Sequence, residues 1–92
     1  MKTVTIQVGN SDNKLSQQEW SDFVSETECA IKNNLHVHFS GGSDCKSPWQ
    51  NYAWVVVGNN EYLAMVRNYI KIIREKYKQE SVAWTEGTTE FI

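Results

Sequence analysis

The order in which strand-like and helix-like periodicities follow one another is the strongest constraint on the fold of this chain. Over residues 3–8, valine and isoleucine alternate with threonine and glutamine, which is typical of a strand with one buried face. Longer segments with apolar residues three or four apart indicate helices. The pattern predicts strands at residues 3–8, 35–39, 52–57 and 81–85, and helices between residues 16 and 33 and at about 61–79.

Both helices carry local signals beyond their periodicity. Ser16 followed by Glu19 has the spacing of a capping box, so the first helix should begin there. Its expected apolar stripe is Trp20, Phe23, Val24, Thr27, Ala30 and Ile31. The stripe expected for the second helix is Tyr62, Val66, Tyr69, Ile70, Ile73 and Tyr77.

This order of elements predicts an α+β fold, the ferredoxin-like split β-α-β-β-α-β sandwich. Two right-handed crossovers joined by a hairpin give a four-stranded antiparallel sheet with both helices on one face. The strand order should be 4-1-3-2. In that topology three connections meet at one edge, namely residues 9–15, residues 40–51 and the segment near Glu80.

Length and composition predict a single domain over residues 1–92. Hydrophobic residues make up 40% of the chain and there is one proline, so a core can form and disorder is not expected. The formal net charge of −2 gives no general attraction to nucleic acid or to anionic membranes.

The sequence leads us to expect a cytoplasmic protein without a metal or other cofactor. The longest apolar run, residues 53–57, is too short to span a bilayer, and the first residues lack the pattern of a signal peptide. Cys29 and Cys45 match no zinc pattern and are expected to be free thiols that lie far apart.

The loop over residues 40–51 is the first candidate site, because hairpin connections usually need only two to five residues. Together with the loop after Gly9 it offers hydrogen-bond donors, acceptors, two lysines and an aromatic ring. We expect this edge to bind a polar or anionic small ligand, or a partner protein. The alternative is that the polar residues form Asx turns and that the tryptophan caps the core. The expected ligand-binding residues are Asn10, Ser11, Asp12, Lys14, Asp44, Lys46, Trp49, Gln50 and Asn51.

Catalysis and metal binding have weaker sequence support. His36 and His38 should share the sheet face opposite Leu35, Val37 and Phe39, but a metal site needs further ligands and no third histidine exists. An enzyme would have to use Asp12, Asp44 or His38 in acid–base roles at the loop edge.

Two surfaces are candidates for partner binding. Tyr52, Trp54 and Val56 make one side of their strand apolar, so an open sheet face could bury itself in a homodimer or stack RNA bases. The neutral-to-acidic composition favours the homodimer, through this face or the tail at Phe91 and Ile92. On the second helix a basic row is a candidate docking surface for a partner, or a solvated face. Its members are Arg67, Lys71, Arg74 and Lys78. The outward residues of the first helix are instead acidic, namely Glu19, Asp22, Glu26 and Glu28.

Three short blocks also carry a resemblance. The sequences at residues 9–12 (GNSD), 48–51 (PWQN) and 83–87 (AWTEG) resemble, in that order, short uncharacterised proteins carried by bacteriophages and other mobile elements. The resemblance implies an accessory or anti-defence role and no activity. The sequence as a whole favours a small non-enzymatic binding protein.

Overall fold

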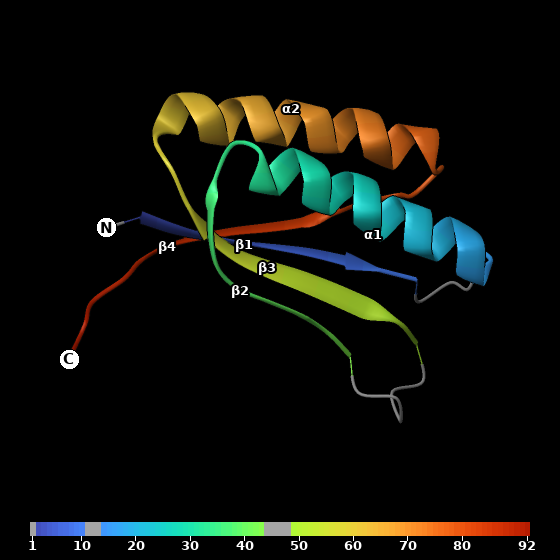
Figure 1. Cartoon of the computed structure of the whole chain (residues 1–92), viewed down its shortest axis with the longest axis horizontal. Coiled ribbons are helices and arrows are strands. Elements are labelled where there is room, and N and C mark those ends of the chain that lie inside the picture. The colour runs from blue at the N-terminus through green and yellow to red at the C-terminus, as the bar shows by residue number, and fades with distance from the viewer. Residues whose placement is uncertain (1, 11–13, 44–48) are drawn as a thin grey trace.

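The chain folds into one antiparallel sheet covered on one face by two helices. The computed structural model describes residues 2–10, 14–43 and 49–92. The elements are β1 (Lys2–Gly9), α1 (Gln17–Lys32), β2 (His36–Gly42), β3 (Asn51–Val57), α2 (Asn60–Lys76) and β4 (Ala83–Thr88). The strand order is β2-β3-β1-β4, and both helices lie on the same side of the sheet (Figure 1). The predicted α+β ferredoxin-like fold and its strand order are confirmed.

The core lies between the helices and the two central strands. In β1 the side chains of Val4, Ile6 and Val8 are almost fully buried, as the alternation predicts. Ile6 pairs with Trp54 and Val4 with Val56, so the buried side of β3 continues the buried side of β1. Helix residues such as Phe23, Ile31, Val66 and Ile70 complete this core.

This pairing corrects one premise of the sequence analysis. Trp54 and Val56 are buried on the helix side, and Tyr52 is packed against the same core. The apolar side of β3 is therefore covered by the helices and does not lie on the open face. Tyr52 and Trp54 cannot stack RNA bases there.

Helix α1 begins as its sequence signal predicts. The Ser16 hydroxyl accepts a hydrogen bond from the Glu19 backbone N–H (3.2 Å), and the Glu19 carboxylate accepts one from the Ser16 backbone N–H (3.0 Å). These contacts lower the pKa of the Glu19 carboxyl below its ordinary value. Within the helix, the Thr27 hydroxyl donates to the Phe23 carbonyl (2.8 Å), so a threonine can lie in the apolar stripe without an unsatisfied hydroxyl.

Helix α2 buries most of its predicted stripe. Val66 and Ile70 are buried, Ile73 and Tyr77 pack against the core, and Leu63 is an additional buried residue. Tyr62 and Tyr69 are instead 49% and 45% exposed. Each precedes a buried residue by one position, which is about 100° around the helix. The prediction was wrong at these two positions because a phenol ring can lie at the margin of a core and keep its hydroxyl in water.

Strand β2 contains an irregularity that places Phe39 on the unexpected face. Val37 pairs with Val56 and Phe39 pairs with Val55, so His38 and Phe39 together oppose one residue of β3. Phe39 consequently shares the helix-free face with Val55 and is 63% exposed. The alternation used to assign it to the core holds only in a strand without a bulge.

The same strand extends further than predicted, through Gly41 and Gly42. A Cβ on Gly41 would lie 3.1 Å from the Phe39 ring, and one on Gly42 would lie 3.3 Å from the Tyr52 ring. Glycine here makes room for neighbouring aromatic rings and does not begin a turn. The connection to β3 therefore starts at Ser43, whose backbone N–H donates to the Asn51 carbonyl (2.9 Å).

An ion pair joins the two helices. Lys76 Nζ lies 2.6 Å from the Glu26 carboxylate, and this contact raises the pKa of the Lys76 ammonium. Glu28 accepts a hydrogen bond from the Trp54 indole (3.2 Å) and also pairs with Lys32 (3.4 Å). The contact from Glu28 to Trp54 ties α1 to the buried side of β3. In the described part of the chain, neither helix is long and apolar enough to cross a membrane.

Gly58, between β3 and α2, provides a test of the close packing beneath the helices. A Cβ at this position would overlap the side chain of Leu35, which is buried. We expect Gly58→Ala to destabilise the fold by about 1–3 kcal/mol, because Leu35 has little room to move. Urea unfolding followed by circular dichroism measures this.

Gly87→Ala is the matched control, because a Cβ there meets nothing within 4 Å. It should leave the free energy of unfolding unchanged within about 0.5 kcal/mol. Equal effects of the two substitutions would contradict the packing argument.

Candidate functional site

The predicted convergence of three connections at one edge of the sheet is confirmed. Gly9 at the end of β1 pairs with Asn51 at the start of β3, and Gly42 at the end of β2 pairs with Tyr52. Ala83 at the start of β4 pairs with Gln7. The ends of β1 and β2 and the starts of β3 and β4 therefore lie together, and we call this region the loop edge.

Asn10 is a buried residue of the loop edge whose side chain is fully engaged in hydrogen bonds. It is 3% exposed, its side-chain nitrogen donates to the Leu15 carbonyl (3.1 Å), and its side-chain oxygen accepts from the Leu15 N–H (3.1 Å). This reciprocal pair joins the two ends of the connection between β1 and α1. Because both polar groups of the side chain are engaged, Asn10 can position the site more readily than it can contact a ligand.

Gln50 ties the same connection to the one between β2 and β3. Its carbonyl accepts from the Asn10 backbone N–H (2.9 Å), and its side-chain oxygen accepts from the Asn10 side chain (3.2 Å). Its side-chain nitrogen donates to Gln17 in the first turn of α1 (2.9 Å). Asn10 and Gln50 thus form a clasp that holds the two connections at a fixed separation.

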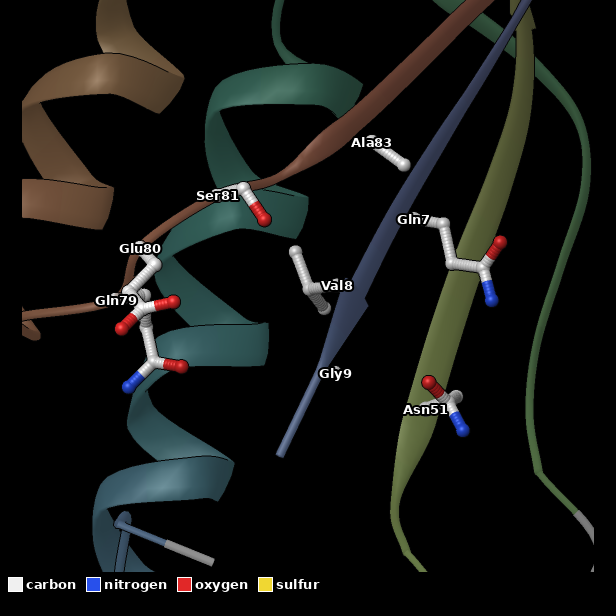
Figure 2. Close-up of a pocket in the computed structure, with 8 residues that line it drawn as sticks. All are labelled: Gln7, Val8, Gly9, Asn51, Gln79, Glu80, Ser81 and Ala83. Carbon is white, nitrogen blue, oxygen red and sulfur yellow. The ribbon is translucent and has the colours of Figure 1, made fainter. Parts of the chain in front are cut away.

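A cleft of about 400 Å³ opens beside this clasp. The ladder between β1 and β4 ends at Gln7 and Ala83, whereas β1 continues to Gly9 against β3. Residues 79–82, which precede β4, therefore do not pair with the last two residues of β1. Figure 2 shows Gln79, Glu80 and Ser81 on one side of the end of β1 and Gln7 and Asn51 on the other. The residues that line the cleft are Gln7, Val8, Gly9, Asn51, Gln79, Glu80, Ser81 and Ala83.

Gln7 and Asn51 also line a second depression of about 290 Å³, beside Gly41, Gly42 and Ala53. The lining of this depression also includes Ser43 and the aromatic Tyr52. A Cβ on Gly9 would lie 2.8 Å from the Asn51 side-chain oxygen. The absence of a side chain at Gly9 is therefore what allows the Asn51 carboxamide to take its present position.

Two hydrogen bonds from Arg74 and an ion pair with Lys14 hold the wall formed by residues 79–81. Arg74 donates to the carbonyls of Gln79 (3.0 Å) and Glu80 (3.3 Å). Lys14 lies 3.7 Å from the Glu80 carboxylate, with both side chains largely exposed. Glu80 is the one charged residue among the described lining residues of the cleft, and Lys14 partly offsets its charge.

The structure brings some predicted ligand-binding residues together and does not describe others. Asn10, Lys14, Gln50 and Asn51 all lie at the loop edge. Trp49 is half exposed there, and its carbonyl accepts a long hydrogen bond from the Ser43 hydroxyl (3.4 Å). Ser11, Asp12, Asp44 and Lys46 lie outside the described residues, as does Cys45, so its expected separation from the exposed Cys29 stays a prediction.

The basic row on α2 is not one continuous surface. Arg67, Lys71 and Arg74 line a groove between α2 and β4. Lys78 follows the end of the helix with a φ of 55°, a left-handed conformation whose N–H donates to the Glu75 carbonyl (3.0 Å). Three of the four expected partner-binding residues therefore share a groove.

The two histidines lie side by side on β2 but away from the loop edge. Their ring centroids are 4.9 Å apart. His38 precedes Gly42 by four residues, roughly 13 Å along a strand, so it does not reach the cleft. Among residues 2–10, 14–43 and 49–92, no three histidine, cysteine or acidic side chains form a cluster suited to a metal ion.

Of the eight residues that line the cleft, only Asn51 was among the predicted ligand-binding residues. Sequence reasoning placed Gln7 only on the outward side of its strand, and residues 79–81 in a connection and the start of a strand. The available signal was the run Gln79, Glu80 and Ser81 at a position where the topology already placed a third connection. No motif marks Gln7.

Comparison with known proteins adds the fold alone. No family model matches the chain, and a search of curated proteins finds no significant match. Among solved structures, a formyltetrahydrofolate deformylase from Pseudomonas putida KT2440 is similar, with a TM-score of 0.52 and 12% sequence identity. The similarity covers 96% of this chain and 28% of that protein, so the chain spans little more than a quarter of its length.

Asn10→Ala tests the clasp. The substitution removes both side-chain contacts with Leu15 and the one with Gln50, and it leaves buried backbone groups without partners. We expect a loss of about 2–4 kcal/mol of stability, because each unsatisfied buried group costs about 1–3 kcal/mol. Thermal unfolding should show a melting temperature lower by about 10 °C or more.

The control is Gln17→Ala, which removes only the exposed contact with Gln50. It should change the free energy of unfolding by less than about 0.5 kcal/mol. A wild-type melting temperature in Asn10→Ala would show that the clasp does not hold the connections.

Proposed function

We propose that this protein is a small non-enzymatic binding domain whose cleft at the loop edge takes a neutral, polar small molecule. The observation that carries the proposal is the cleft lined by three carboxamide residues, Gln7, Asn51 and Gln79, around the end of β1. Gln79 is 8% exposed and its side-chain nitrogen donates to the Tyr77 carbonyl (3.2 Å), so Gln7 and Asn51 are the more accessible amides. Its volume of about 400 Å³ lies within the range of small-molecule sites. Carboxamides both donate and accept hydrogen bonds, which suits a ligand with hydroxyl or amide groups.

The charges at the cleft support a neutral ligand over an anionic one. Glu80 would repel an anion, and Lys14, one of the two lysines expected to attract an anion, lies against that carboxylate. The other expected lysine, Lys46, lies outside the described residues. A ligand without net charge needs neither lysine.

The lining also supports binding over turnover. The described side chains are mainly amides and small residues, and none pairs a nucleophile with a base as acid–base or covalent catalysis requires. In the alternative enzyme, His38 would act at the loop edge, but it lies toward the other end of β2. An accessory or anti-defence role in a mobile element, as the sequence resemblance implies, would then consist of sequestering a small molecule.

Titration of the ¹⁵N-labelled protein with ribose, L-glutamine and inorganic phosphate tests the cleft. We expect ribose or glutamine to shift the signals of Gln7, Asn51 and Gln79, because these carboxamides form the walls. The affinity should be constant across neutral pH, since amides do not titrate. Strongest binding by phosphate, or shifts only outside the cleft, would contradict the proposal.

Gly9→Ala supplies the matched variant. Its new methyl group displaces the Asn51 side chain and should weaken binding roughly two- to tenfold, the effect of one lost hydrogen bond. Gly87→Ala adds the same methyl group in open space and should bind as the wild type does.

We further propose that the protein is a homodimer, on a basis different from the one the sequence offered. The helix-free face carries Val55 and Val57 of β3 and the exposed ring of Phe39. Burial of these apolar side chains against a second copy would remove them from water. The tail at Phe91 and Ile92 is also exposed and is the alternative contact.

Sedimentation at high micromolar concentration measures this assembly. The wild type should sediment as a dimer and Phe39→Ser as a monomer, with little change in folding because the ring is mostly exposed. Replacing Phe91 and Ile92 with serine should leave the dimer intact. A monomeric wild type would remove the homodimer proposal.

A further inference from the structure

The outer side of β4 combines an unpaired strand edge with a basic groove. β4 is the last strand of the sheet and, among the described residues, pairs only with β1. Its outer backbone groups therefore have no strand partner. In Figure 1 helix α2 runs above this side of the sheet, and a groove of about 250 Å³ lies between α2 and β4. We call it the α2–β4 groove.

The groove has a basic wall from α2 and a mixed floor, in which Val82 and Trp84 lie beside Glu80 and Ser81. Arg67, Lys71 and Arg74 come from α2, whereas Val82 and Trp84 come from β4 and the residues before it. The Arg67 guanidinium lies 5.8 Å from the centre of the Trp84 ring. Lys71 is exposed and forms no ion pair with a described residue.

Trp84 is held in a fixed position by β4 itself. Its indole N–H donates to the Glu86 carboxylate (3.0 Å), which also lies 3.3 Å from Lys2. The indole and then the Lys2 ammonium lower the pKa of the Glu86 carboxyl. A fixed aromatic ring beside an arginine gives an incoming segment an ordered surface to pack on.

We propose that the α2–β4 groove docks an extended acidic segment of a partner protein, which adds to the sheet as a fifth strand beside β4. Backbone pairing with β4 supplies the affinity, and the α2 side chains select acidic residues. Every second side chain of an added strand points to the helix side, at intervals of roughly 6.6 Å. Arg67 and Lys71 are one helical turn apart, roughly 6 Å, so acidic residues at alternate positions can reach both.

The same features disfavour two other occupants. A nucleic acid cannot pair with the β4 backbone, because it has no amide groups in the spacing of a strand. A second copy paired through β4 by a two-fold axis would bring the two basic rows near each other. An extended acidic peptide can pair with the β4 backbone, and its carboxylates are opposite in charge to Arg67, Lys71 and Arg74. This site is separate from the proposed homodimer face.

A synthetic peptide that alternates glutamate and threonine tests the proposal on the full chain. We expect it to shift the backbone amide signals of residues 83–88, to slow their hydrogen exchange, and to bind more weakly as salt is added. The same peptide with alternate backbone nitrogens methylated keeps its charge but cannot pair, and it should not bind. Equal binding of the methylated peptide would overturn strand addition.

Charge variants locate the contact. Arg67→Gln with Lys71→Gln should weaken peptide binding roughly tenfold with an unchanged melting temperature. The double variant with Lys76→Gln and Lys78→Gln removes the same number of positive charges at the end of α2, outside the α2–β4 groove. This variant should bind the peptide within about twofold of the wild type. Equal losses in the two double variants would overturn the site. Tighter binding of a short oligothymidylate than of the peptide would also overturn it, in favour of a nucleic-acid groove.

Discussion

The offset between the two ladders on β1 is the constraint on which the rest of the structure depends. With β3, β1 pairs from Val4 to Gly9, and with β4 it pairs from Lys2 to Gln7, so the two ladders are displaced by two residues. The last two residues of β1 therefore have a strand on one side and none on the other. Residues 79–82 pass beside these two residues of β1 without pairing with them. The cleft forms in the space that is left between the segment and β1.

The sequence was sufficient for the fold because its local signals and its order of elements agree. The capping box identified Ser16 as the N-cap, and the alternation in β1 identified its buried residues, although the strand runs one residue further at each end. The assumption that the alternation of a strand continues without interruption was wrong for β2. The bulge at His38 depends on pairing with β3, and no local preference announces it, so Phe39 was assigned to the wrong face.

The location of the candidate site could be predicted from the sequence, but only a few of its residues could. Topology alone put three connections at one edge, and that inference holds. It could not show which polar groups would be engaged with one another. Asn10 and Gln50 have the residue types of a ligand site, yet their amides bind each other and the neighbouring backbone. Gln7 lines both the cleft and the second depression, and no sequence motif marks it.

Arg74 connects the two proposed sites physically. Its guanidinium holds the carbonyls of Gln79 and Glu80, and those residues form a wall of the cleft. The same side chain lines the α2–β4 groove, where Glu80 and Ser81 also appear. A substitution at Arg74 would therefore disturb the wall of one site and the charge of the other together. Among the described residues, no hydrogen bond or ion pair joins Arg67 or Lys71 to that wall, although all of them line the groove. Changes in peptide binding at these two residues therefore report on the groove.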